Sequence, residues 1–375
     1  MSSRSSSGDS RILSLAVCAA GFVTFVNMWC TQAILPVLAA SFHVAEARTG
    51  LTVTAPLVAT AMMAPLIGMI SDRFGRKRFI AGAAFLLVIP TFLAAITQSF
   101  EFFVLCRFVQ GLMLPFIFTI TIAYIGEETS GPATVRLAGI YTSGAIFGGF
   151  SGRMITGVVT AGFGWRPAFF VIGALTLAVA LVLALAMPRE RNFRPLYGIG
   201  RALHSFPLHL TNKRLLATFA TGFGVLFSLV TVFTFINFRL AAAPYHLGPA
   251  ALGGIFVVYL GGVVMSPLAA RLANRFGRVK VMAATGPAIA LGLLLTLAAA
   301  LWSIELGLLV VSSAIFVEQA IATGFIGIVA PEAKSTAVGL YVTFYYIGGS
   351  AGGIVPGGLW HGFGWPGCVD YSKFP

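Results

Sequence analysis

One acidic residue, Glu318, lies deep inside a long apolar run of this sequence. The chain has only 11 acidic residues, and the others fall in polar segments or near the ends of apolar runs. An ionised carboxylate at the centre of a bilayer costs at least about 2.5 kcal/mol on insertion scales, so a buried acid either pairs or marks a pathway. Because desolvation favours the neutral carboxyl, such a group could bind and release a proton. We predict a proton-coupling role for Glu318; a structural pair with a basic residue is the alternative.

Two arginines, Arg107 and Arg153, also fall inside apolar runs. Neither is expected to face lipid, and either could bind an anionic substrate. Four amide side chains in apolar runs could complete a polar lining: Asn27, Gln32, Gln110 and Gln319. Each amide alone could equally make an interhelical hydrogen bond.

Other site chemistries have no candidate residues. The apolar runs contain no nucleophile triad, no metal-ligand cluster and no phosphate-binding Gly-Lys loop, and the four cysteines lack metal-ligand spacing. We therefore predict no enzyme activity, no metal and no cofactor.

The composition indicates the medium in which these residues act. Of 375 residues, 58% are hydrophobic and 9% are charged, with a mean hydropathy of +0.93. Such a chain partners with a lipid bilayer, and its composition argues against soluble enzymes, secreted disulfide scaffolds and disordered tails.

Eleven apolar runs are each long enough to cross about 30 Å of hydrocarbon. The runs are 12–38, 51–70, 79–97, 102–125, 134–160, 166–187, 215–239, 250–270, 279–300, 304–329 and 336–361. We therefore predict an all-α membrane protein with eleven transmembrane helices.

The distribution of basic residues along the chain indicates its membrane topology. The net charge is +13, but the basic residues form short clusters between apolar runs, which is typical of cytoplasmic loops rather than of nucleic-acid binding. If the spans alternate in direction, the basic clusters share one side, so the N-terminus is predicted to be cytoplasmic. The longest polar segment, 188–214, is predicted to be a cytoplasmic linker between an N-terminal six-helix half, 1–187, and a C-terminal half, 215–375.

An internal repeat relates these two halves. A tract recurs 200 residues later, and its first copy is Gly139, Tyr141, Gly148, Gly149, Gly152, Gly157, Gly162, Phe163, Gly164 and Trp165. The basic turn containing Arg73-Phe74-Gly75-Arg76 recurs as Arg275-Phe276-Gly277-Arg278. Two homologous six-span units, related as parallel repeats, are implied.

The second unit lacks one span of the first. After Trp165 a sixth span follows, whereas only ten residues follow Trp365. The last eight residues, 368–375, have no counterpart in the first unit. We therefore expect a truncated or frame-shifted product without its twelfth span; a fragment or a true eleven-span variant is the alternative.

The turn after the second span carries a family resemblance. Gly68-Met69-Ile70-Ser71-Asp72-Arg73-Phe74-Gly75-Arg76-Lys77 resembles the G-x-x-x-D-R-x-G-R-K loop of the major facilitator superfamily. With the repeat, the resemblance covers the chain up to Val369. It implies the major facilitator fold, with two six-helix repeats and the last helix missing.

In that superfamily the turn latches the two halves in one conformational state. The resemblance assigns this role to Gly68, Asp72, Arg73, Gly75, Arg76 and Lys77. The counterpart in the second half comprises Asn274, Arg275, Gly277 and Arg278, and because Asn274 replaces the aspartate, the latch should be asymmetric. The alternative is a basic loop that only sets topology.

Three further motifs indicate a subgroup. Cys30-Thr31-Gln32-Ala33-Ile34-Leu35-Pro36 and the tract from Gly148 to Arg153 are similar to the YnfM-type group of bacterial inner-membrane transporters, which lies near the drug:proton antiporters. Arg107-Phe108-Val109-Gln110-Gly111 resembles the antiporter R-x-x-Q-G motif, whose arginine is associated with proton coupling. The stretch 144–152 departs from the antiporter pattern because it contains no proline.

Glycines are concentrated in the fifth and eleventh spans. Small residues allow helices to approach closely in membranes, and the resemblance implies a gasket or hinge between the halves. The residues concerned are Gly148, Gly149, Gly152, Gly348, Gly349 and Gly352. Inert packing is the alternative.

These observations predict a secondary active transporter of the bacterial inner membrane, acting as a monomer without nucleic acid. The two halves would rock about a central site, and protons at Glu318 would drive efflux of a small molecule by alternating access. The alternative is a truncated, non-transporting product of a damaged transporter gene.

Overall fold

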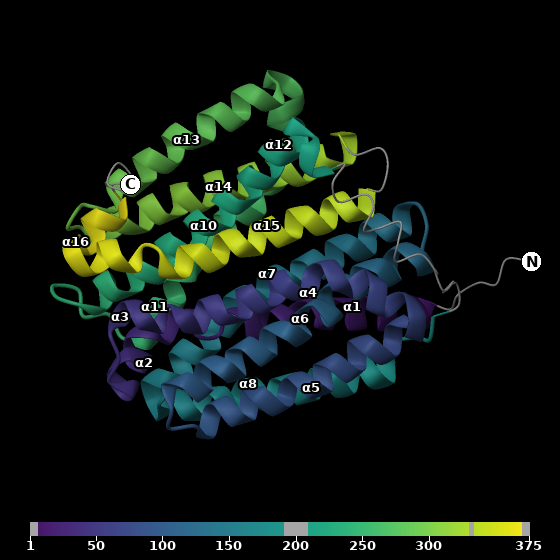
Figure 1. The fold of residues 1–375 in the computed structure, drawn as a ribbon, viewed down its shortest axis with the longest axis horizontal. Helices are drawn as coiled ribbons and strands as arrows, with labels where there is room; N and C mark the ends of the chain where they lie inside the picture. Colours follow the sequence, from purple (N-terminus) through teal and green to yellow (C-terminus); the bar gives the residue numbers. More distant parts are fainter. Residues whose placement is uncertain (1–6, 191–208, 330–333, 370–375) are drawn as a thin grey trace, which may run out of the picture.

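The computed structural model of the chain describes residues 7–190, 209–329 and 334–369, apart from the side chains of 7–10, 68–74, 263, 327, 328 and 334–336. Within these residues every regular element is a helix. Figure 1 shows two groups of long helices lying side by side, with the first half of the chain in purple and blue and the second in green and yellow. The predicted all-helical membrane fold is confirmed.

The first half contains six long helical segments, the first of which is broken. Its elements are α1 (Ser7–Trp29), η1 (Gln32–Ile34), α2 (Leu35–Phe42), α3 (Glu46–Thr49), α4 (Leu51–Phe74), α5 (Arg76–Ile96), α6 (Phe100–Glu128), α7 (Pro132–Phe163) and α8 (Trp165–Ala186). Prolines inside α4, α5 and α6 each remove one backbone donor from these helices.

The second half repeats this order in its described part. Its elements are α10 (Lys213–Ala241), α11 (Pro249–Gly254), η2 (Ile255–Val258), α12 (Tyr259–Phe276), α13 (Arg278–Leu295), α14 (Leu301–Val329), α15 (Lys334–Ile354) and α16 (Gly357–Val369). We call the end of the bundle that carries Arg76, Arg78 and Arg278 the basic end, and the opposite end, which carries Glu46 and Glu101, the far end.

Nine helical segments of the described chain are long and apolar enough to cross a membrane, and the bent pair of α15 and α16, which meet at 76°, makes a tenth. The remaining long helix, α7, has 32 residues, which is more than a bilayer crossing needs. It packs against α1 and α8. Each of the eleven predicted runs falls on helical residues, but α7 is not among the helices that are apolar enough, so the described residues give nine or ten candidate spans rather than the predicted eleven.

The glycine stripes pack helices within each half. A Cβ at Gly148 would overlap the backbone of Phe22 in α1, and a Cβ at Gly348 would overlap that of Phe223 in α10. Four residues further along, Gly152 meets Val26 and Gly352 meets Phe227 in the same way. Equivalent glycines of the two halves therefore make equivalent contacts between helices.

These contacts bear on the role of the glycines. The stripes lie mainly at the α1–α7 and α10–α15 pairs, inside each half, and the gasket or hinge between the halves stays a prediction. A Cβ at Gly149 would approach Trp29 and Arg153 of its own half, and only one at Gly349 would approach the other half, at 3.2 Å from Leu57.

The turns before α8 and at the matching point of the second half are also equivalent. Gly164 and Gly364 both have positive φ, at +89° and +61°, a conformation that a β-carbon disfavours. The following residues, Trp165 and Trp365, are both buried. The chain after Gly364 therefore begins as α8 does, and its described part ends at Val369.

The two halves differ in how they cover their third helix. The most apolar stretch of α5 is 56% buried, whereas that of the equivalent helix α13 is 22% buried. Helix α8 packs against α5, and no described helix occupies the corresponding face of α13. The second half is thus less covered than the first.

The glycine contacts predict a position-specific effect on stability. In Gly148→Ala the new Cβ would lie 2.8 Å from Phe22 Cα, so α7 must move away from α1, at a cost of about 1–3 kcal/mol. A lower melting temperature of the detergent-solubilised protein is expected. The control Gly139→Ala lies on the same helix with nothing within 4 Å of its Cβ and should be unchanged or stabilised. Equal melting of the two variants would contradict this packing.

Candidate functional site

The halves meet most closely toward the far end of the bundle. A Cβ at Gly50, between α3 and α4, would overlap Gly353 of α15, and one at Gly157 of α7 would lie 2.5 Å from the carbonyl oxygen of Pro249 in α11. Thr54 Oγ1 also donates to Ser350 O at 3.1 Å. These glycine contacts, which the sequence patterns did not reveal, bring backbone against backbone and leave little space between the halves there.

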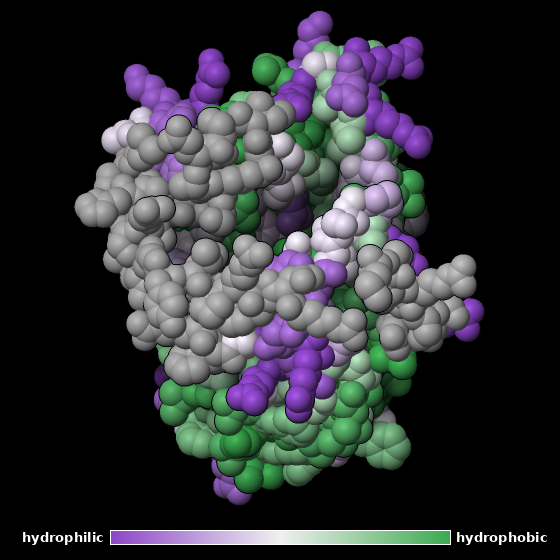
Figure 2. Space-filling model, turned by 90° about the vertical axis from the view of Figure 1, so that its right-hand side faces the viewer, coloured by the Kyte–Doolittle hydropathy of each residue, from purple (hydrophilic) through white to green (hydrophobic). Residues whose placement is uncertain are grey.

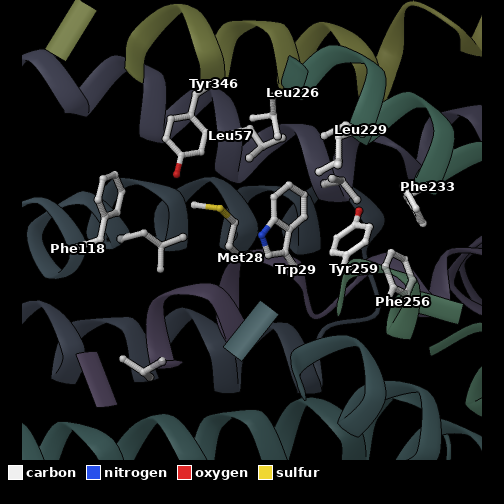
Figure 3. Packing of buried hydrophobic residues seen from close by; sticks show 14 of the residues in the cluster. Met28, Trp29, Leu57, Phe118, Leu226, Leu229, Phe233, Phe256, Tyr259 and Tyr346 are labelled. Atoms are coloured by element: carbon white, nitrogen blue, oxygen red, sulfur yellow. The ribbon is translucent and has the colours of Figure 1, made fainter. Parts of the chain in front are cut away.

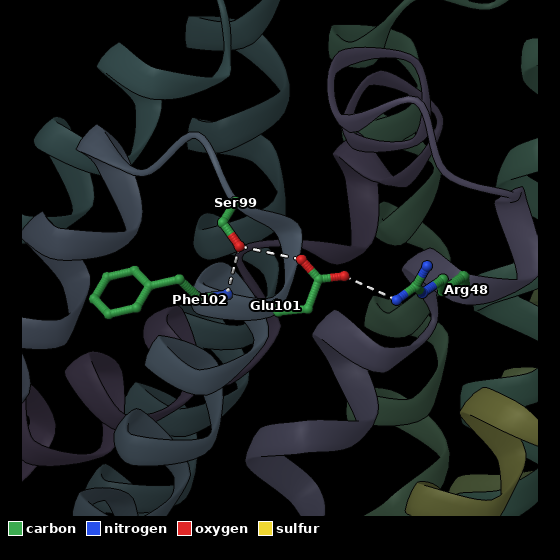
Figure 4. Close-up of polar contacts among 4 residues, drawn as sticks. All are labelled: Arg48, Ser99, Glu101 and Phe102. Atoms are coloured by element: carbon green, nitrogen blue, oxygen red, sulfur yellow. Dashed lines mark hydrogen bonds and ion pairs between the residues drawn. The ribbon is translucent and has the colours of Figure 1, made fainter.

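Polar contacts reinforce this closed end. Trp360 Nε1 of α16 donates to Glu46 Oε2 of α3 at 2.8 Å, which joins the two halves. Figure 4 shows that the neighbouring Arg48 pairs with Glu101 of α6 at 2.8 Å. This surface pair, more than half exposed on both sides, fixes α3 on its own half rather than on the other.

The basic end has a different appearance. Figure 2 views the molecule from the end that carries the N-terminus and shows hydrophilic side chains gathered around a hollow that leads inward. Deeper in the bundle, the rings of Phe118 in α6 and Tyr346 in α15 meet across the halves at 6.2 Å. The structure therefore combines a closed far end with a hollowed basic end.

Arg107 of α6 is fully buried and holds the broken first span together. Its Nη1 and Nη2 donate to Asn27 O and Met28 O at 2.7 Å each, two carbonyls of the last turn of α1. Its Nε donates to Thr52 O at 3.1 Å, whose helical partner four residues later would be the nitrogen of Pro56. The guanidinium thus supplies donors to carbonyls that a helix break and a proline leave free.

Polar side chains continue from Arg107 across the first half. Nη1 of Arg107 also donates to Gln110 Oε1 at 2.5 Å, and Gln110 Nε2 donates to Thr91 Oγ1 of α5 at 2.7 Å. Thr91 Oγ1 lies 3.2 Å from Asn27 Oδ1, and Asn27 Nδ2 donates to Thr176 Oγ1 of α8 at 2.9 Å. Three predicted residues, Arg107, Gln110 and Asn27, therefore share one network.

Arg153 of α7 forms a second centre, at the boundary between the halves. Its Nε and Nη2 donate to Gln32 Oε1 at 2.9 and 2.7 Å, and its Nη1 donates to Gly149 O at 2.7 Å. Its Cζ lies 4.8 Å from the ring centroid of Trp29, 4.3 Å from that of Phe256 and 5.1 Å from that of Tyr259. One ring comes from the first half and two from the second.

Gln32 carries this centre across to the second half. Its backbone oxygen accepts from Asn237 Nδ2 of α10 at 3.0 Å, and its side-chain nitrogen lies 3.4 Å from Thr234 Oγ1. Figure 3 shows Trp29 beside Tyr259, with Phe256 and Phe233 on the side of Tyr259 away from Trp29. We call Trp29, Gln32, Arg153, Asn237, Phe256 and Tyr259 the junction.

Glu318 lies apart from both arginine centres. It sits about 26 Å from the far end of α14 and about 16 Å from the basic end, at 1.5 Å per residue. Thr285 Oγ1 of α13 donates to Glu318 Oε1 at 2.5 Å, and the neighbouring Gln319 donates to Tyr345 of α15 at 3.2 Å. The described contacts of Glu318 include a hydroxyl and no basic group, so the structural-pair alternative finds no partner among the described residues.

The described part of the expected latch binds Glu127 of the first half and Glu190 of the linker. Arg76 pairs with Glu127 of α6, with Nη2–Oε1 at 2.5 Å and Nε–Oε2 at 3.1 Å. Lys77 N donates to Glu190 Oε2 at 3.3 Å, so this carboxylate sits at the N-terminus of α5, which begins after Gly75. The described residues do not include the side chains of Asp72 and Arg73 or the surroundings of Gly68.

The second basic turn repeats the backbone but not the ion pair. Gly75 and Gly277 end their helices at nearly equal φ, +88° and +86°. Arg278 lies over the ring of Phe325 in α14 at 5.7 Å, between the helices equivalent to those joined by Arg76 and Glu127. Asn274 and Arg275 are exposed. The contacts of Arg76 and Arg278 thus differ between the two turns, and the asymmetry of a latch through Asp72 and Asn274 stays a prediction.

Comparison with known proteins identifies the class to which this fold and these polar centres belong. Residues 17–353 match the Major Facilitator Superfamily model, and the chain belongs to that family of membrane transporters. It is a multi-pass secondary transporter of small molecules, not an enzyme.

Its relatives cover most of its length. It is 36% identical over 359 residues to "Inner membrane transport protein YnfM" of Escherichia coli, a match that spans 95% of this chain and 85% of that protein. It is 33% identical over 352 residues to an "Uncharacterized transporter" of Buchnera aphidicola, with 94% and 85% covered. A shorter match, 28% over 207 residues, relates 55% of the chain to 50% of the multidrug transporter MdfA of Edwardsiella piscicida.

Solved structures show the same fold. The nucleoside transporter NupG superposes with a TM-score of 0.81 at 16% identity and covers 95% of each chain. A bacterial homologue of the lysosomal transporter Spinster, in an inward-facing and unoccupied conformation, gives a TM-score of 0.77 at 18% identity, over 96% of this chain and 84% of that one.

The Arg107 contacts predict that its planar shape matters as well as its charge. In Arg107→Lys a single ammonium with three donors replaces a fork that reaches carbonyls on two helices. Each carbonyl left without a donor should cost about 1–3 kcal/mol, so the melting temperature should fall clearly. The exposed Arg78→Lys is the control and should melt as the unmodified protein does. Unchanged melting of Arg107→Lys would show that these contacts contribute little.

Proposed function

We propose that the protein exports a small molecule in exchange for protons by alternating access. The carrying observation is the uneven contact between the halves, which is tight at the far end and gives way to a hollow at the basic end. If the halves, 1–187 and 215–375, rock about the junction, the far end opens as the basic end closes. The junction, which joins both halves toward the far ends of α7 and α10, is the pivot in this proposal.

The basic end is the cytoplasmic side in this proposal. Cytoplasmic loops of membrane proteins carry an excess of Lys and Arg, and Arg78, Arg275 and Lys280 are all at this end. The structure then represents a state open to the cytoplasm, with the N-terminus inside, in the inner membrane where the relative YnfM is found.

Glu318 is the proposed proton-coupling residue. It is partly buried within α14, its described partner is a hydroxyl rather than a cation, and a membrane-embedded acid of this kind is a functional candidate. Because Glu318 faces α13 and Gln319 faces α15, protonation could change how these helices pack. Arg107 is proposed to support this coupling indirectly, by holding the break in α1.

The latch is proposed to act in the opposite state. In the observed state Arg76 binds Glu127 of its own half, and the backbone N–H of Lys77 donates to Glu190 of the linker. When the basic ends approach each other, Asp72 could reach the N-terminus of a helix of the second half, where a carboxylate is favoured. The glycines of the α4–α15 and α7–α11 contacts are the proposed sliding surfaces.

Efflux rather than uptake is proposed because of the partial match to MdfA, a multidrug transporter by name, together with the R-x-x-Q-G motif at Arg107. The second candidate, a protein that does not transport, is favoured by a different observation, the low burial of α13 relative to α5. Transport assays separate the two.

The proton role of Glu318 predicts a specific loss. In proteoliposomes with pyranine in the lumen, the unmodified protein should release protons when a compound from a panel of aromatic anions, amides and ammonium ions is added. Glu318→Gln should abolish this release, because the amide cannot titrate, while melting stays unchanged. Glu305→Gln, an exposed acid on the same helix, should behave as the unmodified protein. Full proton movement by Glu318→Gln would remove the proton-site assignment, and silence of the unmodified protein across the panel would favour the non-transporting product.

The orientation can be tested on whole cells. A cysteine in Arg78→Cys, at the basic end, should react with a membrane-impermeant maleimide only after the cells are opened. A cysteine in Phe163→Cys, which replaces a side chain 79% exposed at the far end of α7, should react in intact cells. The reverse pattern would place the N-terminus outside.

A further inference from the structure

The junction holds an arginine whose donors are only partly used. A guanidinium has five N–H donors, and the described partners of Arg153 take three, two on Gln32 Oε1 and one on Gly149 O. One N–H therefore remains on each Nη nitrogen. A carboxylate or sulfonate accepts two such N–H groups at once.

Arg107 shows the contrast within the same half. Its described acceptors are Thr52 O, Asn27 O, Met28 O, Gln110 Oε1 and Cys30 Sγ, and each of its three nitrogens donates to at least one of them. Arg107 is therefore a structural cation, whereas Arg153 retains the donors that a ligand needs.

No carboxylate of the described residues lies within ion-pair distance of Arg153; the described ion pairs are Arg48–Glu101 and Arg76–Glu127. Arg153 is nevertheless 1% exposed. Buried charges in membrane proteins normally pair or mark a substrate pathway, and the rings of Trp29, Phe256 and Tyr259 compensate the charge only in part.

Two polar atoms of the junction are also unsatisfied. The hydroxyl of Tyr259 and Oδ1 of Asn237 are buried without a hydrogen-bond partner in the described structure. Tyr259 can donate to an anion, and its ring lies 5.1 Å from Arg153 Cζ. A second donor and an apolar aromatic surface thus accompany the free guanidinium donors.

The repeat shows that this arginine is specific to one half. The residue 200 positions after Arg153 is Gly353, which packs closely against Gly50 and Thr54. The equivalent contact between the halves therefore needs no side chain. Packing alone does not account for a cation at position 153.

We propose that the junction binds an amphipathic organic anion, an aromatic body bearing one carboxylate or sulfonate. The anionic group binds the two free N–H donors of Arg153 and the Tyr259 hydroxyl, and the aromatic body lies against Trp29 and Phe256. The site lies between the halves, so it recognises a solute and not a lipid at the outer surface. The inference rests on the proposed function, in which the junction is the pivot of transport, and it assigns the substrate class.

Binding without a proton gradient tests this assignment separately from transport. The purified protein in detergent is titrated by calorimetry with benzoate, 1-naphthoate and 1-naphthalenesulfonate, and with 1-naphthamide and 1-naphthylmethylammonium as neutral and cationic partners of similar shape. At least one anion should bind ten times more tightly than the amide, and the ammonium ion should bind no better than the amide. If no anion binds more tightly than the amide, the assignment is overturned.

Variants locate the binding. Arg153→Gln should weaken anion binding at least tenfold and leave amide binding unchanged. Arg166→Gln is the matched control, because Arg166 also lies over an aromatic ring, that of Trp165 at 4.4 Å, but outside the junction; it should bind as the unmodified protein does. Unchanged anion binding by Arg153→Gln would overturn the proposal.

A milder variant covers the case in which Arg153→Gln does not fold. Tyr259→Phe removes only a hydroxyl without a described partner, and should weaken the anion about threefold to tenfold with unaltered melting. Equal affinity would exclude the hydroxyl from the site and contradict the assignment. Glu318→Gln should bind the anion normally. If the unmodified protein binds the anion but moves no protons, the proposed function is contradicted and this inference stands. If the unmodified protein couples protons only to the movement of cations, this inference is contradicted and the proposed function stands.

Discussion

A helix inside a bilayer cannot break unless something supplies donors to the carbonyls that the break releases. The first span of this protein breaks after Trp29, and the buried Arg107 bonds to Asn27 O and Met28 O, while its third nitrogen serves a carbonyl freed by Pro56. The break places Trp29 and Gln32 at the boundary between the halves, where Arg153 binds the Gln32 side chain. The junction therefore depends on a cation that never needs to touch a substrate. The same solution recurs with hydroxyls, since Thr60 donates to Gly111 O in α6 and Thr231 to Gly352 O in α15, four residues before Pro115 and Pro356.

The two halves share a fold but carry different polar side chains at equivalent positions. Glycine contacts between α1 and α7 are repeated between α10 and α15, so both halves contain the same close helix pair. The functional side chains do not repeat: Arg153 stands where the second half has Gly353, Arg76 pairs with Glu127 where Arg278 lies over Phe325, and Glu318 belongs to the second half alone. In the proposed function, one half supplies the cationic centre and the other supplies the acid and two of the three aromatic walls. Such a division would make both halves necessary to bind and to couple.

Much of this could be predicted from the sequence, and the reasons for the rest are physical. Hydropathy and the 200-residue repeat are sufficient for the helices and the family because bilayer crossing constrains every span. A polar side chain in an apolar run needs a partner, which made Arg107, Gln110, Arg153 and Gln32 recognisable in the sequence. The sequence did not reveal their partners, because the rotation of each helix decides which residues meet. The glycine stripes face their own half, Glu318 faces α13, and Phe256 and Tyr259 reach Arg153 from more than 100 residues away. Aromatic residues are too common here, with 33 Phe in the chain, for spacing to single out two walls.

The central claim is that the halves move oppositely at the two ends about the junction. Electron paramagnetic resonance distances between spin labels test it most directly, with one pair at positions 78 and 279 of the basic end and another at 163 and 302 of the far end, all exposed in the structure. In nanodiscs, lowering the pH or adding an aromatic anion should shorten the basic-end distance and lengthen the far-end distance. If both distances change in the same direction, or neither changes although ligand binds, the account of two halves rocking about Arg153 and Gln32 is contradicted.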